Sequence, residues 1–146
     1  MTGRSSPAPP VASGGAGLLV VVVAYHSPKL LDHCLGSLGG AFDVVVVDNS
    51  SDPAVAAVTD DHGCAYVDPG RNLGFAGGVN AGCAQRTGRD VLLLNPDAAV
   101  TPAAVRALRA ALAAVPRLAA VAPAQSGPDG GAPDQVAWPF PTPGGA

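Results

Sequence analysis

The stretch Val91-Leu92-Leu93-Leu94-Asn95-Pro96-Asp97 indicates the fold of this chain. Its unbroken run of aliphatic residues is typical of a strand covered on both faces, which predicts a place in the middle of a parallel sheet. Pro96 has no backbone N–H and ends the strand, so Asp97 is expected at the strand's carboxyl edge. Ligands of open α/β sheets bind at this edge. A carboxylate there can hold a divalent cation, and the cation can hold a diphosphate.

Three more apolar runs precede this strand, and helical signals follow each of them. The predicted strands are 18–24, 44–47, 65–67 and 91–94. Helices are expected to begin at the cap-then-proline pairs Ser27-Pro28, Asp52-Pro53 and Thr101-Pro102. The first two should end at Gly39-Gly40 and at Gly63. A glycine-rich loop over 68–78 should lead into another helix that ends near Thr87-Gly88, and Leu118–Ala122 is a candidate for one more strand.

Strand-then-helix units in succession, joined by short links, predict an α/β fold. We expect a Rossmann-like nucleotide-binding architecture with a mostly parallel sheet and helices on both faces. The predicted organisation is a disordered leader over residues 1–17, an α/β domain over 18–125, and an irregular Pro/Gly-rich tail over 126–146.

Composition excludes several classes of protein. The net charge is −3 and the Lys and Arg residues are scattered, whereas nucleic-acid binding would need a basic stripe. Cys34, Cys64 and Cys83 fit neither a disulfide framework nor a metal finger, so we expect buried thiols in a reducing compartment. No run approaches the ~20 apolar residues of a transmembrane helix, and the run over 18–24 does not fit a signal peptide. The expected location is the cytoplasm.

Polar residues at the ends of the predicted strands suggest a nucleotide-diphosphate site. Tyr25 offers an aromatic ring, Asp48 offers an acceptor for the edge of a base, and Asp97 offers a metal ligand. Arg71-Asn72 opens the glycine-rich loop and could lie near phosphate. Because a right-handed parallel sheet brings its strand ends to one edge, we expect these residues to converge there.

Each of these residues also has a purely structural interpretation. Tyr25 can be a half-buried amphipathic residue, Arg71 a solvated charge, and Asp48 the start of a turn. Asp97 can simply precede a loop. The glycines of 74–82 can serve close packing of a helix on the sheet. Their cost to the helix, roughly 1 kcal/mol each, instead suggests that something must approach the backbone closely.

Two other nucleotide-binding motifs do not fit. The Gly-x-Gly-x-x-Gly fingerprint should follow the first strand directly, but Tyr25-His26-Ser27-Pro28 stand there and the next glycine is Gly36. The sequence contains no Gly-Lys-Ser/Thr, which excludes a P-loop. A Rossmann-type oxidoreductase is therefore disfavoured.

Four pieces of the sequence, taken together, resemble one enzyme family. They are VVVVAYHS (20–27), VVVVDNSS (44–51), GRNLGFAGGVNAG (70–82) and LLLNPDAAV (92–100). In this combination and order the chain resembles the inverting family 2 glycosyltransferases of the GT-A fold, particularly their rhamnosyltransferase-like branch. The resemblance extends over roughly 18–121.

The resemblance implies roles for residues around the nucleotide. Tyr25 and Ser27 would line its pocket, and Asp48 would hydrogen-bond a pyrimidine-type base. The residues implied beside the ribose and diphosphate are Arg71, Asn72 and Gly74, with Asn80 as a weaker candidate. The implied donor is deoxythymidine-diphospho-rhamnose (dTDP-rhamnose) or a uridine-diphospho (UDP) sugar. The implied acceptor is a glycan or a lipid-linked sugar, which could draw the parent enzyme to the inner face of the membrane.

The same resemblance implies a metal site. Asn95-Pro96-Asp97 would correspond to the family's Asp-any-Asp element, with Asn95 beside the substrate. Asp97 would bind Mg²⁺ or Mn²⁺ that bridges the diphosphate of the donor. Because Asn95 stands at the first acidic position, this chain has one carboxylate fewer than the family element.

Length is the largest departure from the family. Such enzymes have a donor half followed by an acceptor half, which supplies the catalytic base. Neither Asp129 nor Asp134 looks like that base, so the resemblance implies a truncated chain: the N-terminal donor half, inactive alone. The alternative is a stand-alone nucleotide-binding module without catalysis.

Overall fold

The computed structural model describes residues 17–87, 89–127 and 129–131. Its elements in chain order are β1 (Leu18–Ala24), α1 (Pro28–Ser37), β2 (Asp43–Asp48), α2 (Pro53–Asp61), β3 (Ala65–Val67), α3 (Gly74–Cys83), β4 (Asp90–Leu94) and α4 (Pro102–Ala114). The chain divides between Val105 and Arg106 into two compact units, and the first contains every strand. This division falls inside 18–125, and that domain range stays a prediction. The predicted leader and tail lie mostly outside the described residues.

The strands form one parallel sheet in the order β3-β2-β1-β4. In its register, Val20 of β1 lies between Val44 of β2 and Leu92 of β4. The parallel arrangement brings the loops that follow all four strands to the same edge. The predicted α/β class, with its strand-helix alternation, is confirmed.

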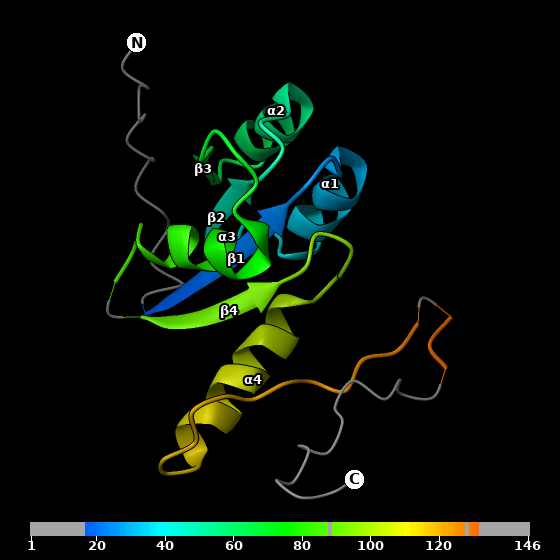
Figure 1. The fold of residues 1–146 in the computed structure, drawn as a ribbon. Coiled ribbons are helices and arrows are strands. Elements are labelled where there is room, and N and C mark those ends of the chain that lie inside the picture. Colours follow the sequence, from blue (N-terminus) through cyan, green and yellow to red (C-terminus); the bar gives the residue numbers. More distant parts are fainter. Residues whose placement is uncertain (1–16, 88, 128, 132–146) are drawn as a thin grey trace, which may run out of the picture. The chain divides into compact units, whose positions relative to one another are not determined.

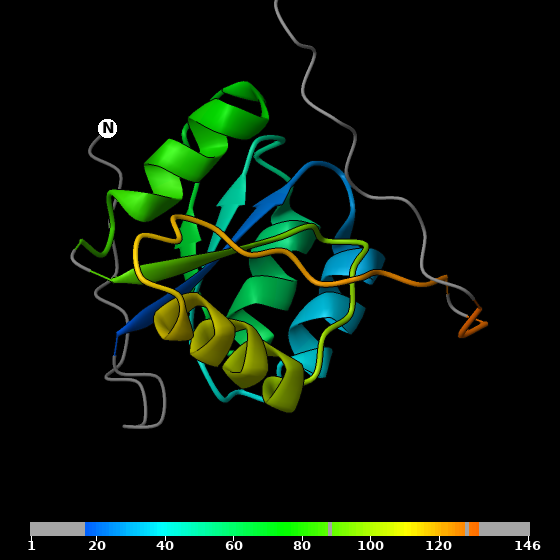
Figure 2. The same cartoon turned by 90° about the horizontal axis from the view of Figure 1, so that it is seen from below.

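Helices cover both faces of the sheet (Figures 1 and 2). On one side lie α1 and α2, and on the other side lies α3. Val20 and Val22 of β1 pack in a cluster with buried residues of α1, α2 and the first turn of α4. Leu19 and Val21, which alternate with them, pack in a second cluster with Ala81 of α3. Since β1 is covered on both faces, its sequence is continuously aliphatic rather than alternating.

The helices that follow the cap-then-proline pairs begin where predicted. The Asp52 carboxylate accepts a hydrogen bond from the Ala54 amide (2.9 Å), and Thr101 Oγ1 accepts one from the Ala104 amide (3.2 Å). Ser27 precedes α1, but its hydroxyl makes no capping bond. Its Oγ is buried and has no hydrogen-bond partner in the described part of the chain. No helix in the described ranges is long and apolar enough to cross a membrane.

The predicted central position of the 91–94 strand was wrong, because β4 lies at an edge of the sheet. Leu92 and Leu94 pack on the core, whereas Val91 and Leu93 are 41% and 48% exposed. Val91 and Leu93 lie on the face of the sheet that α3 covers, but α3 packs on β1 and β2 and leaves these two side chains exposed. An aliphatic run shows that a strand is apolar on both faces, but it does not show what covers each face.

Two other predicted segments were also wrong. The third predicted helix, α3, ends at Cys83 rather than near Thr87-Gly88, because the amides of Gln85 and Arg86 bond to carbonyls three residues back and tighten the turn. Arg86 then extends toward Asp43, with Nε 3.4 Å from Oδ2. Leu118–Ala122 forms no strand, since its alanines have low strand propensity and no described strand pairs with it.

Candidate functional site

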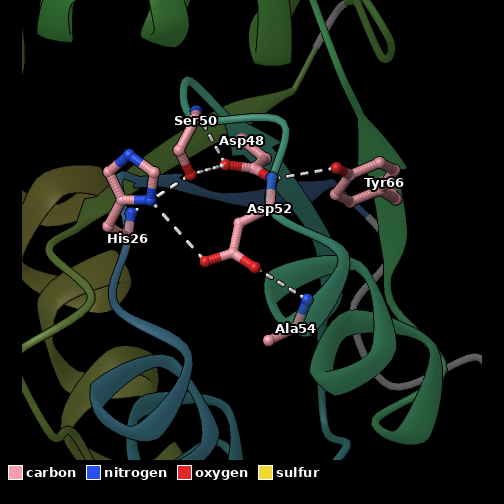
Figure 3. Close-up of polar contacts among 6 residues, drawn as sticks. All are labelled: His26, Asp48, Ser50, Asp52, Ala54 and Tyr66. Atoms are coloured by element: carbon pink, nitrogen blue, oxygen red, sulfur yellow. Dashed lines mark hydrogen bonds and ion pairs between the residues drawn. The ribbon is translucent and has the colours of Figure 1, made fainter.

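Hydrogen bonds join three loops at the carboxyl edge of the sheet: those between β1 and α1, β2 and α2, and β3 and α3. The amide of His26 in the first loop donates to Ser50 Oγ in the second (3.1 Å). His26 Nδ1 lies 3.6 Å from Asp52 Oδ2, as Figure 3 shows. Ser51 Oγ donates to Asp68 Oδ1 in the third loop (2.8 Å). The predicted convergence is confirmed for these three loops, and the convergence of the Asp97 loop with them stays a prediction.

Asp48, the last residue of β2, is the buried acceptor at the centre of this network (Figure 3). Its Oδ1 accepts from the amide and hydroxyl of Ser50, and its Oδ2 accepts from the Asp52 amide (2.7 Å) and the Tyr66 hydroxyl (2.9 Å). Burial by itself would raise the pKa of this carboxyl, but the four hydrogen bonds outweigh it and lower the pKa below the ordinary 3.8. All acceptor positions of the carboxylate are engaged within the protein. Asp48 therefore holds the loop, and its contact with a base stays a prediction.

Sequence reasoning missed Tyr66, which lies on β3 beside Val46 of β2. Its hydroxyl reaches across to Asp48. Burial, this bond and the negative charges of Asp48, Asp68 and Asp52 raise the pKa of the phenol well above its usual range. Tyr66 therefore remains protonated and donates. The sequence did contain a signal for this contact: Tyr66 lies on the predicted strand that follows the one ending at Asp48.

Sequence reasoning also missed Asn49, which follows Asp48 directly. Its amide donates to the Ala24 carbonyl (2.9 Å), which ties the end of β1 to the loop after β2. Its side chain donates to the Gly74 carbonyl (3.0 Å) and accepts from the Leu73 amide (3.3 Å). Asn49 thus holds the start of α3. The predicted site residue Asn72 acts there too, since its Oδ1 accepts from the Gly74 amide (2.8 Å).

The other predicted residues of this edge are less constrained. Tyr25 is 56% exposed, and its ring meets that of His26 edge-on at 4.5 Å between centroids. Arg71 is exposed and makes no hydrogen bond or ion pair with a described residue. His26 and Ser51 have left-handed backbone angles, with φ of 47° and 51°. Such conformations cost on the order of 1–2 kcal/mol in a residue with a Cβ and cluster at functional sites.

The predicted metal ligand lies in the loop after β4, at the same edge of the sheet. The Ala98 amide donates to the Asn95 carbonyl (3.1 Å), which closes a turn with Asp97 in it. Asp97 and Asn95 are both exposed, and the Asp97 carboxylate makes no hydrogen bond or ion pair with a described residue. Within the described ranges, no three His, Cys, Asp or Glu side chains form a metal cluster. A free carboxylate beside an amide fits Mg²⁺ or Mn²⁺, which one or two carboxylates hold together with substrate phosphates.

Gly78 and Gly82 of α3 allow the helix to pack closely on the sheet, which is the packing interpretation of the glycines. A Cβ on Gly78 would lie 2.7 Å from a methyl of Val23, and one on Gly82 would lie 2.6 Å from a methyl of Val21. The sheet is thus what approaches the helix backbone. Gly74 differs, since its φ of +69° requires glycine while open space surrounds it.

All three cysteines are free, and Cys34 and Cys64 should resist alkylation in the folded chain. Burial is the main cause that raises the pKa of each thiol to about 11. At pH 8 only about one such thiol in 1,000 is the reactive thiolate. Iodoacetamide should therefore modify both residues about 100-fold more slowly in native protein than in urea, as followed by peptide mass spectrometry. Equal rates in the two conditions would contradict this burial.

Comparison with known proteins identifies the family of this chain. The sequence matches the profile of Glycosyl transferase family 2 over residues 19–142. The chain belongs to glycosyl transferase family 2. It is also 30% identical over 95 residues to the low-salt glycan biosynthesis hexosyltransferase Agl10 of Haloferax volcanii, an alignment that covers 62% of this chain and 31% of that relative. The chain thus spans about a third of this curated relative.

Solved structures share the fold of this family 2 chain. TarS of S. aureus (residues 1–349) matches with a TM-score of 0.54 and 24% identity, over 66% of this chain and 32% of TarS. The mannosyltransferase PcManGT of Pyrobaculum calidifontis, in complex with GDP-Man and Mn²⁺, matches with a TM-score of 0.59 and 20% identity, over 66% and 32% of the two chains. The GT-A expectation for the fold is confirmed.

Proposed function

We propose that this chain binds a nucleotide-diphospho-sugar together with Mg²⁺ or Mn²⁺ at the carboxyl edge of its sheet. In the whole protein, the sugar would pass with inversion to a hydroxyl of a glycan or a lipid-linked acceptor. The observation that carries the proposal is the exposed Asp97 carboxylate in the loop after β4, at the edge where the Asp48 network orders the neighbouring loops. Family membership and the GDP-Man and Mn²⁺ complex of PcManGT support it.

The residues of the edge suggest how the donor would be held. The exposed ring of Tyr25 offers a face for the base, and the Arg71 guanidinium offers a positive charge for the diphosphate. Asn72 and Gly74 form the backbone turn at the start of α3, where phosphates commonly bind. For Asp48 we propose an indirect role, in which it shapes base recognition through the loop that it holds.

We also propose that Ser27, in the loop after Tyr25, lines the nucleotide site, since its buried hydroxyl has no hydrogen-bond partner among the described residues. Asn95 would act beside Asp97 as a neutral oxygen ligand or as a contact to the donor. When bound, the divalent cation neutralises charge that develops on the departing nucleoside diphosphate. The base that deprotonates the acceptor is proposed to lie outside this chain.

The donor and the location also stay proposals. We favour a rhamnosyl-type donor, dTDP-rhamnose, with UDP-sugars next, because the sequence pieces resemble that branch. We propose that the chain works in the cytoplasm and that its parent enzyme meets lipid-linked acceptors at the inner face of the membrane.

Titration calorimetry of UDP, dTDP and GDP with and without Mn²⁺ tests the donor site. Wild type should bind at least one of these diphosphates more tightly with Mn²⁺. Asp97→Ala should lower the Mn²⁺-dependent affinity by about 10-fold or more, while leaving the metal-free affinity unchanged. Asp60→Ala, at another exposed aspartate, is the matched control and should bind as wild type does.

Two outcomes would contradict the proposal. Equal Mn²⁺-dependent affinities in wild type and Asp97→Ala would remove the metal role of Asp97. Tighter binding of NAD than of every sugar-nucleotide diphosphate would instead favour a Rossmann-type oxidoreductase.

A further inference from the structure

The Asp97 loop, residues 95–101, is fastened to α1 on both sides of Asp97. Before Asp97, the Cys34 thiol donates to the Asn95 carbonyl at 3.5 Å. After Asp97, Ser37 Oγ accepts a hydrogen bond from the Val100 amide at 3.0 Å. These contacts join residues 61 and 63 positions apart in the sequence. They fasten the backbone of the loop to a helix, in addition to the turn that the Ala98 amide closes within the loop.

The two anchors form one unit on α1. Cys34 and Ser37 are three residues apart, so they lie on the same side of the helix. The Ser37 hydroxyl donates to the Cys34 carbonyl (2.7 Å), which leaves its lone pairs to receive the Val100 amide. Cys34 is fully buried, and the Val100 side chain packs on the same core cluster.

The anchors matter because they act on the loop backbone, whereas no hydrogen bond to a described residue holds the Asp97 side chain itself. It is exposed and has no hydrogen-bonding partner among the described residues, so only its backbone sets its position. A metal ligand that is held in advance avoids the entropy cost of being ordered when the metal binds. The N-terminus of α1 directly follows the loop that carries Tyr25. The helix therefore connects the Tyr25 part of the proposed site to the Asp97 loop.

We propose that Cys34 and Ser37 are positioning residues that hold the Asp97 loop in its metal-binding conformation. This inference rests on the proposed function, in which Asp97 binds Mg²⁺ or Mn²⁺. It assigns a task to a thiol and a hydroxyl that touch neither donor nor metal. Their loss should change the metal requirement specifically, and not only the stability of the fold.

The test measures the Mn²⁺ concentration that produces half of the maximal increase in affinity for UDP and dTDP. Ser37→Ala and Cys34→Ala should each raise that Mn²⁺ concentration roughly 10-fold, the low end of the effect of outer groups on metal affinity. Affinities without metal should not change. Ser37→Thr keeps a hydroxyl and Cys34→Ser supplies a hydroxyl donor in place of the thiol, so both variants should recover most of the loss. The matched control is Thr59→Val, which removes a buried hydroxyl that bonds inside α2 and should leave the Mn²⁺ requirement unchanged.

A double-mutant cycle with Asp97→Ala separates positioning from a general loss of stability. On the Asp97→Ala background, Ser37→Ala should have no further effect on the Mn²⁺ requirement. Anchor variants that lower the melting temperature but keep the wild-type Mn²⁺ requirement would overturn the positioning role and leave the proposed function standing. Wild type whose affinities for UDP, dTDP and GDP are all independent of Mn²⁺ would overturn both the positioning role and the proposed function.

Discussion

Replacing Asp48 with alanine is expected to lower the free energy of unfolding by about 3 kcal/mol. The substitution removes the acceptor for two backbone amides and two hydroxyls at the end of β2. Buried donors left without an acceptor cost about 1–3 kcal/mol each, although exposure of the relaxed loop will recover part of this. Urea unfolding followed by far-UV circular dichroism gives the measurement. Tyr66→Phe removes one of the four bonds and should cost about 1 kcal/mol, while Asp60→Ala should cost under about 0.5 kcal/mol.

The pH dependence of the same variant provides a second readout. Because the pKa of Asp48 is lowered in the folded chain, its carboxylate stabilises the fold above the unfolded pKa. That stabilisation is lost as the pH falls through the folded pKa, which lies below 3.8. The stability difference between wild type and Asp48→Ala should thus be largest at pH 7. It should shrink as the pH falls below the folded pKa of Asp48. A difference that stays constant down to the acid limit of folding would show that the hydrogen-bond network is not its source.

The network variant and the metal-ligand variant should also differ in binding. Asp48→Ala releases the loop beside Tyr25 and should weaken nucleotide binding with and without Mn²⁺, and it should erode discrimination between bases. Asp97→Ala should act only in the presence of Mn²⁺. The pair thereby separates the base side of the proposed site from its metal side.

Local signals in the sequence predicted most of the fold. The 18–24 and 65–67 strands have the predicted bounds, because each apolar run is closed by residues that stop a strand. Asp52-Pro53 predicted both the start of α2 and the acceptor that caps it. Helices on both faces follow from the aliphatic strands, since such strands need cover on both sides.

What the sequence did not predict depends on contacts between distant residues. The edge position of β4 is set by the order of the strands, and the apolar run over 91–94 carries no information on that order. The bonds from Asn49 to the start of α3 and from Tyr66 to Asp48 cross between elements. Their residue types are ordinary for turns and strands, so only the assembled sheet distinguishes them.

The glycines of α3 illustrate the same limit, and they lead to a second large effect. Gly78→Ala and Gly82→Ala should each destabilise the fold by about 1–3 kcal/mol, because the new methyl group overlaps a valine of β1. Valine has a strongly restricted side-chain rotamer, so it cannot easily turn away. Thermal and urea unfolding measure the loss. Gly36→Ala in α1 is the matched control: its Cβ would meet only His62, at 3.9 Å. That variant should gain up to about 1 kcal/mol from helix propensity.

The opposite signs of these helix substitutions separate packing from propensity. If the glycines were kept for a ligand, Gly82→Ala would stabilise the free chain as Gly36→Ala does and would weaken nucleotide binding instead. If close packing decides, Val21→Ala should make room for the added methyl group, so that Gly82→Ala costs less on that background than in wild type. Val21 is buried beneath Gly82 on β1, so its own truncation will cost stability, but the coupling between the two positions remains measurable. An additive pair would mean that the sheet relaxes around the new side chain, and that contact with Val21 is not what requires glycine at position 82.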